Sequence, residues 1–458
     1  MRRNVLSGTS RRDFLKKSGI LTVGTLLAVQ NTPRVHAAES NTLKIAIVGC
    51  GNRGAGAVRQ ALAADPNVVL WAVADTFQDK ADGITVAVKA DLDNRGQSKK
   101  FGVTDDRRFV GFDAYKKAMD TLDKGDVVIL TTPPGFRPLH YAYAVEKGLH
   151  VFAEKPVAVD IPGLKWLQEA NKVAKEKGLK VAVGLNNRHY FRTEETIKAI
   201  HDGRIGDVIS TFVYRMQPSG MGRPVGNLTP LEYQLRNIFS FTWTSGGSIV
   251  DGLIHNLDIC CWAMGQGDDA IIPVACQGYG GRVFRNSPDE RIDHALCEFY
   301  FADGRKMTMH AKYIPNTWPC FQGVVHRAKG SAIVGEQVRD PKLFQDFNAI
   351  KERRDGVYWA PESPVNDSYQ TEHDRFFKAI REDRPWNEMN RSIDATFVPI
   401  LGRMAVDTGQ YVTADMAWSS TFKYVENIAD LSFDKPAPVL PDENGNYAQP
   451  IPGQTVYW

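Results

Sequence analysis

The sequence predicts an α/β protein with a doubly wound parallel sheet in its N-terminal part and a large, mostly antiparallel sheet after it. Strand and helix patterns alternate from residue 43 to about residue 185, as a doubly wound sheet requires. After Arg188 the strands are longer and alternate apolar with polar residues, which is typical of an antiparallel sheet with one face on helices. The chain of 458 residues is long enough for about two or three domains.

Short apolar strands and helices alternate in the N-terminal part. The expected strands are Leu43–Val48, Val68–Ala74, Asp126–Thr131, His150–Ala153 and Lys180–Gly184. The expected helices are Asn52–Ala64, one helix within residues 77–108, Phe112–Leu122, Pro138–Lys147 and Gly163–Lys177. Helical connections between successive strands are what a parallel sheet needs.

The C-terminal part combines longer strands with helices. The expected strands are Asp207–Arg215, Val274–Tyr279, His294–Phe301, Lys306–Tyr313 and Phe321–His326, and the expected helices are Thr193–His201, Tyr369–Glu382 and Ile393–Gln410. Residues 413–458 are rich in Pro, Asn and Asp and are expected to form an irregular tail. We therefore divide the chain into an N-terminal signal at 1–38, a first domain at 39–187, a second domain at 188–412 and a tail at 413–458.

A glycine-rich turn follows the first strand, in the sequence Leu-Lys-Ile-Ala-Ile-Val-Gly-Cys-Gly-Asn-Arg-Gly of residues 43–54. Gly49 and Gly51 allow a tight turn and a close approach of the backbone to a pyrophosphate, and Gly54 allows the helix to pack closely on the strand. The helix N-terminus offers N–H groups to the phosphates. Asp75, at the end of the second strand, is placed to bind a ribose and to repel the additional phosphate of NADP. A glycine-rich surface turn is the alternative, but the order of elements favours a pocket for NAD.

The first forty residues resemble a targeting segment. Ser10-Arg11-Arg12-Asp13-Phe14-Leu15-Lys16 is a twin-arginine head, residues 20–29 form a short apolar core, and Val35-His36-Ala37 precedes a cleavage site. This pattern predicts a bacterial protein exported in the folded state to the periplasm. A basic tail and an uncleaved anchor are the alternatives.

Charge and apolar content argue against two kinds of partner. The chain has 56 Lys and Arg against 53 Asp and Glu, and residues 1–37 alone hold seven of the basic and one of the acidic side chains. No basic patch indicates nucleic acid. No apolar run after residue 40 is long enough to span a bilayer, so we expect no stable membrane span after processing.

The cysteines are expected to be buried free thiols. They are Cys50, Cys260, Cys261, Cys276, Cys297 and Cys320. An even number in an exported protein allows disulfides, but Cys50 lies in the glycine-rich turn, and Cys260 and Cys261 are neighbours on an expected helix. Their spacing is not that of a zinc site, so no metal is predicted.

Two strand ends carry unusual side chains, at the edge of the sheet where ligands bind. Thr131-Thr132-Pro133-Pro134 follows the third strand, and its hydroxyls either face the cofactor or stabilise a turn. Glu154-Lys155-Pro156 follows the next strand. The Lys155 ammonium either stabilises a developing alkoxide or forms an ordinary surface pair with Glu154.

A third segment places titratable groups on one helical face. Asp251, His255 and Asp258 follow Gly246-Gly247 at positions i, i+4 and i+7. A carboxylate one turn away can orient an imidazole and raise its basicity, and an imidazole can take a hydroxyl proton near neutral pH. A packed polar histidine and a metal site are the alternatives, although no fourth metal ligand is evident.

These motifs, together with Gly184-Leu185-Asn186-Asn187-Arg188 and Gly203-Arg204-Ile205-Gly206, resemble the Gfo/Idh/MocA family of glucose–fructose oxidoreductase and inositol dehydrogenase type enzymes from about residue 43 to residue 412. The resemblance implies a Rossmann domain, a second α/β domain with an open sheet, and homo-oligomers, either dimers or tetramers. It implies Lys155, Asp251 and His255 at the active site, with His255 as the acid/base. One departure concerns Gly252, because many members carry this glycine one residue later. The segment 217–243 and the tail are also outside the common pattern.

The predicted site has three sets of residues. The catalytic set is Lys155, His255 and Asp251. The cofactor-binding set is Gly49, Gly51, Asn52, Arg53, Gly54, Asp75, Thr131, Thr132, Pro133, His140, Glu154 and Lys155. The candidate sugar contacts are Arg188, Tyr190, Tyr214, Arg236, Asn237, Trp243 and Asp258, because aromatic and amide groups suit the mixed apolar and hydroxyl faces of a polyol.

The expected reaction is hydride transfer between a secondary hydroxyl of a sugar or polyol and NAD. His255 would take the hydroxyl proton, Lys155 would stabilise the oxygen, and Asp251 would orient His255. An exported enzyme has no free pool of the cofactor, so NAD would be held tightly and its hydride would be passed to a second substrate or to a partner acceptor. The alternatives are redox-neutral glycoside hydrolysis or elimination through a keto-sugar, and a carbohydrate-binding protein without activity, which the intact motifs disfavour.

Overall fold

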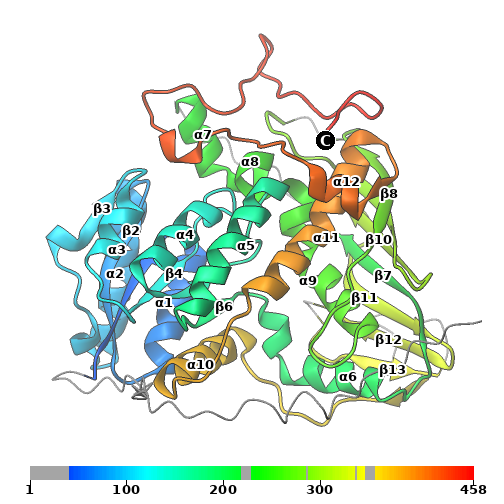
Figure 1. Cartoon of the computed structure of the whole chain (residues 1–458), viewed down its shortest axis with the longest axis horizontal. Coiled ribbons are helices and arrows are strands. Elements are labelled where there is room, and N and C mark those ends of the chain that lie inside the picture. The colour runs from blue at the N-terminus through cyan, green and yellow to red at the C-terminus, as the bar shows by residue number, and fades with distance from the viewer. Residues whose placement is uncertain (1–40, 218–227, 285–286, 336–337, 346–355) are drawn as a thin grey trace, which may run out of the picture. The chain divides into compact units, whose positions relative to one another are not determined.

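The computed structural model describes residues 41–217, 228–284, 287–335, 338–345 and 356–458. Residues 42–458 form one compact unit, and only this unit is described below. The predicted signal at 1–38 lies outside the described residues. Within these limits the predicted α/β class is confirmed, because one sheet is parallel and the other mostly antiparallel (Figure 1).

In the described part of the chain, six parallel strands form the N-terminal sheet in the order β3-β2-β1-β4-β5-β6. The strands are β1 (Leu43–Val48), β2 (Val68–Asp75), β3 (Arg108–Val110), β4 (Val127–Leu130), β5 (His150–Ala153) and β6 (Val181–Val183). The helices between them are α1 (Asn52–Ala64), α2 (Gln78–Asn94), α3 (Ala114–Asp120), α4 (Arg137–Lys147) and α5 (Ile161–Glu176). The order reverses between β1 and β4, which is where an open α/β sheet binds its ligand.

The first strand shows how the sequence determines these layers. Side chains alternate between the two faces of a strand. Ile45 and Ile47 pack in one buried cluster with residues of α1 and of the later helix α10 (Ser368–Arg381), whereas Ala46 and Val48 pack in another cluster with residues of α3 and α4. A strand buried on both faces reads as a continuous apolar run, as residues 45–48 do.

In the second sheet, the strands within the described ranges have the order β14-β13-β12-β11-β7-β10-β9-β8-β15. Their bounds are β7 (Val208–Met216), β8 (Ala275–Gly281), β9 (His294–Tyr300), β10 (Lys306–Lys312), β11 (Cys320–Arg327), β12 (Gly330–Val334), β13 (Lys342–Phe344), β14 (Val357–Trp359) and β15 (Val412–Thr413). All of these neighbours pair antiparallel except β7 and β10. The helices α6 (Phe191–His201), α9 (Gly247–Met264) and α11 (Met389–Thr408) belong to the same half of the unit.

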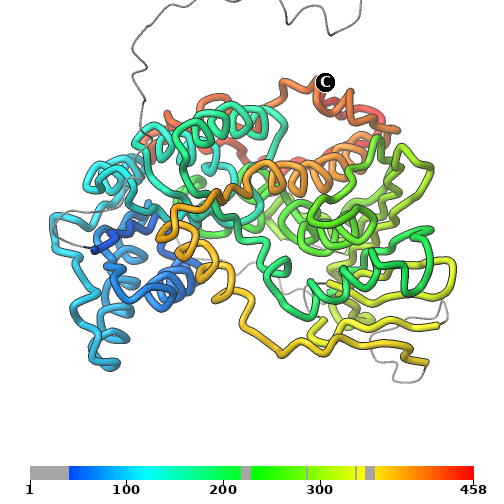
Figure 2. The backbone as a smooth tube through the Cα atoms, turned by 60° about the horizontal axis from the view of Figure 1, so that its bottom comes forward, coloured from blue at the N-terminus to red at the C-terminus, as the bar shows by residue number. Residues whose placement is uncertain are grey.

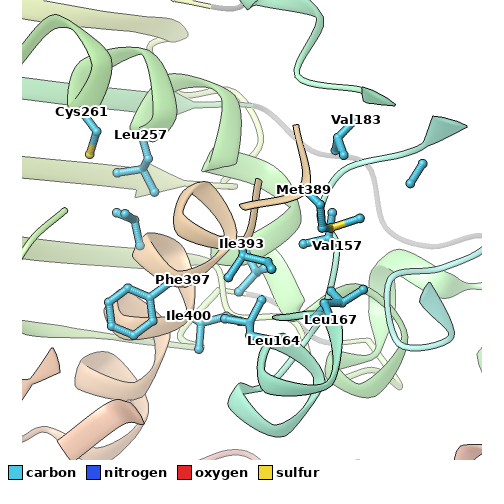
Figure 3. Packing of buried hydrophobic residues seen from close by; sticks show 14 of the residues in the cluster. Val157, Leu164, Leu167, Val183, Leu257, Cys261, Met389, Ile393, Phe397 and Ile400 are labelled. Carbon is cyan, nitrogen blue, oxygen red and sulfur yellow. The ribbon is translucent and has the colours of Figure 1, made fainter. Parts of the chain in front are cut away.

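One apolar core joins the two halves. Figure 3 shows Val157, Leu164 and Leu167 of the N-terminal half beside Ile393 and Ile400 of α11. Helix α11 also packs on α9 and β8, and Figure 2 shows α11, in orange, between the first sheet and the second. The continuous core fixes α9 relative to the ends of β4 and β5, which matters because the catalytic candidates lie on both sides of it.

Most predicted elements are confirmed within one to four residues, and β1, α1 and β5 match the expected bounds. The strands β3 and β12 to β15 were missed, since several contain only two or three residues and show no clear periodicity. The predicted irregular tail is largely confirmed, although it contains the short helix α12 (Ala414–Ser419). The six cysteines are buried free thiols, as expected. Among the described helices, none combines the length and apolar character needed to cross a bilayer.

The segment after β7 and the tail lie close together. The segment contains α7 (Pro230–Arg236), a 3₁₀ turn at Ile238–Ser240, and α8 (Thr242–Ser245). In Figure 1 the tail, in red, passes beside α7, and Gln234 Nε2 donates to the Val439 carbonyl at 2.6 Å. The segment and the tail therefore contact each other.

Candidate functional site

A cavity of about 420 Å³ opens beside the C-terminal ends of β1, β2 and β4. Seven of the predicted cofactor residues line it, namely Gly49, Gly51, Asp75, Thr131, Thr132, Pro133 and His140. The volume falls within the usual range for small-molecule pockets. The prediction of a ligand groove at this edge of the sheet therefore agrees with the geometry.

The glycines of the turn are required by close contacts. Gly49 has φ +98°, and a Cβ placed on it would lie 2.7 Å from the backbone N of Thr132. A Cβ on Gly54 would lie 2.1 Å from the Gly49 carbonyl oxygen. Gly51 precedes α1 and has no side chain to cap it, so the first N–H groups of α1, including that of Asn52, remain suited to a phosphate.

Asp75 is fixed at the rim of this cavity. Its carboxylate accepts hydrogen bonds from the N–H groups of Cys50 at 2.6 Å and Phe77 at 2.9 Å. Burial raises the pKa of Asp75, whereas these hydrogen bonds and the charge of Lys80 lower it. A carboxylate has about four acceptor sites, so lone pairs remain for the hydroxyls of a ribose.

Replacement of Asp75 is expected to relax cofactor selectivity. In Asp75→Ala the repulsion of a 2′-phosphate is lost, and Lys80 and Arg236, which line the same cavity, can attract that phosphate. We expect the ratio of affinities for NAD and NADP to fall by about 10-fold or more, in line with the Coulomb energy of one charge near a surface. Titration of nucleotide-free protein with both cofactors measures the ratio, and an unchanged ratio would remove Asp75 from the ribose site.

Thr132 and His140 form a neutral hydrogen-bonded pair. Thr132 Oγ1 and His140 Nδ1 are 3.1 Å apart, and the imidazole packs against Tyr115 and Phe136. Burial and the charge of Arg137 lower the pKa of His140 to about 3. His140 therefore orients the Thr132 hydroxyl without adding charge to the groove.

Arg137, which sequence reasoning missed, holds the turn after β4. Its guanidinium is buried and donates to the carbonyl oxygens of Leu130 and Thr132, the latter at 2.6 Å. Two carbonyls at a strand end are thereby satisfied by one side chain. The sequence could have indicated Arg137, because it is a charged residue that begins a helix shortly after two prolines.

Arg53 and Glu154 do not line the cavity as predicted. The guanidinium of Arg53 forms ion pairs with Glu154 and, at 3.5 Å, with Glu372, and it stacks on the Tyr369 ring. Gly184 leaves the space for this pair, since a Cβ there would lie 2.6 Å from Glu154 Oε2. The side chains of Arg53 and Glu154 thus tie α1 to the end of β5, and only the backbone of Arg53 remains placed to face a phosphate.

Lys155 and Asp251, 96 residues apart in sequence, meet at the end of β5. Lys155 Nζ lies 3.4 Å from Asp251 Oδ1 and donates to the Asp251 carbonyl oxygen at 3.3 Å. The two side chains keep 19% and 24% of their exposure. Ala153, the last residue of β5, pairs with Leu130, the last residue of the neighbouring strand β4. The Lys155–Asp251 contact therefore lies one strand away from Thr131, which lines the groove.

His255 is a buried, neutral imidazole. It is 5% exposed, and its Nδ1 atom is buried without a hydrogen-bond partner in the described structure. Burial lowers the pKa of His255 well below 6.5, and the positive charges of Lys155 and Arg215 add to the shift. The imidazole is therefore unprotonated at neutral pH and can accept a proton.

The predicted role of Asp251 needs a correction. Asp251 and His255 are one helical turn apart, but no described hydrogen bond joins them, and the Asp251 carboxylate contacts Lys155 instead. The Lys155 ammonium at the end of β5 carries a positive charge that attracts the Asp251 carboxylate, whereas the neutral imidazole of His255 carries none. The Asp251 carboxylate therefore lies against Lys155 and does not contact His255 as expected.

Arg215 and Tyr313 complete this site, and neither was predicted. The Tyr313 hydroxyl donates to the Ser248 carbonyl at 2.8 Å, and burial raises its pKa to about 12. A Cβ on Gly252 would lie 2.5 Å from that hydroxyl and 3.5 Å from Arg215 Nε. Because Gly252 has no side chain, Tyr313 and Arg215 can approach the first turns of α9.

Removal of the Arg215 charge is expected to shift the pH profile. In Arg215→Gln the pKa of His255 should rise, because one of the cations that lower it is gone. The base acts when it is deprotonated, so the acid limb of kcat/KM should move to higher pH. Lys306→Gln, an exposed change on β10 of the same sheet, is the control. An acid limb at the wild-type position in Arg215→Gln would show that Arg215 does not act on His255.

Two candidate sugar contacts are joined in a buried ion pair. Arg188 donates to both carboxylate oxygens of Asp258 at 2.7 and 2.8 Å and lies over the Trp262 ring. Each side chain is no more than 3% exposed. The pair links the segment after β6 to α9, and its hydrogen bonds are used within the protein.

The remaining sugar candidates also have other partners. Tyr190 donates to the Arg339 carbonyl, Tyr214 stacks on His310, Arg236 binds Asp79, Asn237 donates to the Tyr233 carbonyl, and Trp243 donates to Gln234. Tyr214 alternates with the buried Val213, so it faces away from α9. The described contacts bring none of these five to Lys155 or His255, because side-chain direction depends on packing that the sequence pattern does not reveal.

Known proteins are similar in sequence to part of this chain. Residues 43–185 match the model of the Gfo/Idh/MocA family, described as an oxidoreductase family with an NAD-binding Rossmann fold. A Glycosyl hydrolase family 109 protein from Streptomyces coelicolor is 27% identical over 45% of this chain and 43% of its own length, and an Inositol 2-dehydrogenase from Rhizobium meliloti is 25% identical over 49% and 56%. A D-glucoside 3-dehydrogenase from Escherichia coli is 27% identical over 32% and 38%. The chain thus spans about half the length of the curated relatives it matches.

Solved structures share the fold over most of the chain. An aldose-aldose oxidoreductase from Caulobacter crescentus has a TM-score of 0.60 at 18% identity, covering 81% of this chain and 99% of its own. A levoglucosan dehydrogenase in complex with NADH and levoglucosan has a TM-score of 0.59 at 18% identity, with the same coverage. These structures support the two-sheet architecture.

Proposed function

We propose that this chain is an NAD-dependent oxidoreductase of the Gfo/Idh/MocA type, acting on a secondary hydroxyl of a sugar or polyol, because residues 43–185 match the model of that family with its NAD-binding Rossmann fold. The observation that carries the proposal is the contact of Lys155 with Asp251 at the end of β5, with His255 one helical turn after Asp251 on α9 and the Lys155 charge lowering the pKa of His255. The relatives named an inositol dehydrogenase and a glucoside dehydrogenase support the substrate class.

The residues present fit NAD. The contacts of Gly49 and Gly54 leave a cradle that a Cβ would fill, α1 lacks a side-chain cap, and Asp75 supplies an acceptor at the rim of the cavity. When bound, NAD would supply the hydride acceptor of the reaction. The chain itself supplies the groups that bind and activate the hydroxyl.

Three side chains divide the work at that hydroxyl. His255, held neutral, takes the proton from the substrate oxygen. The Lys155 ammonium stabilises the negative charge that develops on this oxygen, in the manner of a preorganised donor. Asp251 fixes the position of Lys155, and the Tyr313–Ser248 hydrogen bond fixes the first turn of α9 that carries Asp251.

A second candidate function is redox-neutral cleavage of a glycoside. In such a reaction a keto group on the sugar acidifies the neighbouring C–H bond, and loss of that proton expels the aglycone and leaves a double bond. Water then adds to the double bond, and bound NAD would supply both the oxidation that forms the keto group and the reduction that removes it. The relative named a Glycosyl hydrolase family 109 protein favours this possibility.

The twin-arginine head at 10–16 supports a periplasmic location, where each turnover must regenerate NAD in the site. A retained cofactor suits both functions.

A panel of glycosides and free sugars distinguishes the candidates. The purified protein is incubated with each compound, and keto-sugar, free aglycone and the 340 nm absorbance are measured. A keto-sugar with reduced cofactor supports the oxidoreductase, and free aglycone without net reduction supports glycoside cleavage. Binding of sugars without any product would contradict both and would favour a carbohydrate-binding protein without activity.

We also propose that the chain forms dimers or tetramers. The outward face of the second sheet carries apolar side chains, among them Leu296, Tyr279 and Tyr300, and Tyr279 is 64% exposed. Large exposed apolar areas are typical of interfaces. Native mass spectrometry reports the subunit number, and a monomer at micromolar concentration would contradict the assignment.

A further inference from the structure

Part of the cofactor cavity is built by residues from outside the Rossmann domain. Leu235, Arg236 and Ile238 line it opposite Asp75 and Phe77. Leu235 and Arg236 end α7, and Ile238 begins the following 3₁₀ turn. The segment after β7 therefore covers the same end of the groove at which Asp75 would bind a ribose.

An ion pair ties this segment to the Rossmann domain. Arg236 donates to both carboxylate oxygens of Asp79, at 2.8 and 3.1 Å, and its guanidinium lies 4.0 Å from the centre of the Phe77 ring. Asp79 belongs to the first turn of α2. Bidentate pairs of this kind fix geometry as well as adding energy, so α7 is held directly over the cavity.

The tail adds a second attachment at the same place. The Phe433 ring lies 5.0 Å from the Phe112 ring and 5.8 Å from the Phe77 ring, and both partners line the cavity. The ring centroids are at the separations that favour aromatic pairs. A residue near the end of the chain thus covers two side chains of the first domain.

The segment and the tail also support each other. Gln234 donates to the Val439 carbonyl and accepts from the buried Trp243 indole at 2.7 Å. The rings of Phe241 and Tyr447 lie 4.9 Å apart. The segment and the tail are therefore packed against each other beside the cavity.

We propose that Arg236 and Phe433 close a clasp, formed by residues 229–245 and 424–447, that retains NAD between turnovers. The proposal rests on the proposed function, since it assumes that NAD occupies the cavity. With the clasp closed, a nucleotide at Asp75 lies between the Rossmann domain and α7. Its release then requires the Arg236–Asp79 pair and the Phe433 contacts to open.

Dissociation of the cofactor tests the clasp. The holoenzyme is loaded with NADH, and the loss of its fluorescence is followed after addition of excess NAD. Arg236→Ala and Phe433→Ala are expected to increase the dissociation rate by about 10-fold each, as for loss of about 1.4 kcal/mol in the closed state. Asp79→Asn breaks the same ion pair from an exposed position outside the cavity lining and should give a similar increase.

Arg305→Ala is the matched control. The Arg305–Asp303 pair lies between β9 and β10, and its side chains are 24% and 48% exposed, against 24% and 54% for Arg236 and Asp79. Loss of this ion pair in Arg305→Ala should leave the dissociation rate of NADH unchanged. Wild-type rates in Arg236→Ala, Asp79→Asn and Phe433→Ala would overturn the clasp.

The clasp and the proposed function fail in different ways. If NADH is retained and released faster by the clasp variants, but no sugar or glycoside is converted, the clasp stands and the proposed reaction is wrong. If sugars are converted and NADH leaves equally fast from all proteins, the reaction stands and the clasp is wrong. A protein that binds no NADH contradicts both.

Discussion

Lys155→Ala is expected to lower kcat for the sugar by about 10²–10³-fold, the cost of removing one preorganised donor from a developing oxyanion. The ammonium lies at the end of β5, held by Asp251 at 3.4 Å and by the Asp251 carbonyl, so it needs little reorganisation when charge develops. The cavity beside Asp75 does not include Lys155. The content of bound NAD should therefore change little.

The measurement is single-turnover reduction at 340 nm in holoenzyme of known NAD content. Lys172→Ala is the control, because Lys172 is an exposed lysine on α5 that binds only Glu169 among its described partners. Asp251→Asn should give a smaller loss than Lys155→Ala, since it weakens the placement of the ammonium without removing it. A kcat for Lys155→Ala within a few fold of wild type would remove Lys155 from the reaction.

His255→Asn is expected to lower kcat by about 10²–10⁴-fold, the usual contribution of a positioned general base. Asparagine keeps a polar side chain in the buried site but cannot accept the proton. The wild-type profile of kcat/KM should lose activity only well below pH 6.5, because burial, Lys155 and Arg215 depress the pKa of His255. The residual activity of the variant should lack this acid limb.

His310→Asn provides the control for loss of an imidazole. His310 is half-buried on the outward face of β10, where it stacks on Tyr214. Thermal unfolding of both variants separates loss of structure from loss of the base. If His255→Asn keeps the acid limb, another group takes the proton and the assignment fails.

The parallel half of the fold could be predicted because its strands are continuous apolar runs between clear helices. The glycine-rich turn, Asp75 and the threonines after β4 were found from position alone, since the ends of parallel strands meet at one edge of a sheet. Lys155 was singled out as a lysine at a strand end and His255 as a histidine between two acidic residues on one helical face, and the family resemblance added to both. Local pattern and tertiary structure agree at these positions.

The sugar contacts could not be predicted in the same way. Arg188 and Asp258 are polar residues near the site, but they neutralise each other in a buried pair, and sequence spacing does not reveal pairing between segments. Arg215 was missed although it follows Thr211 and Val213 on the inward face of β7. The position of a charged residue in line with the inward face of this strand could have identified Arg215 as a candidate.

The role of Asp251 shows the limit of helical spacing as evidence. Positions i and i+4 share a face, so the sequence favours a contact with His255. The residue that meets the carboxylate comes from β5 instead, through the packing of α9 and α11 against the first domain. Only the fold of residues 42–458 as one unit brings that partner into place.

The proposed reaction requires NAD to lie in the groove with its reactive ring facing Lys155 and His255. An experimental structure of the protein with NADH and a bound sugar would locate that ring. We predict the nucleotide ribose at Asp75, and the sugar oxygen within about 3–3.5 Å of Lys155 Nζ and a His255 ring nitrogen, the separation of a reactive complex. A nucleotide bound elsewhere, or a sugar remote from these two side chains, would contradict the account.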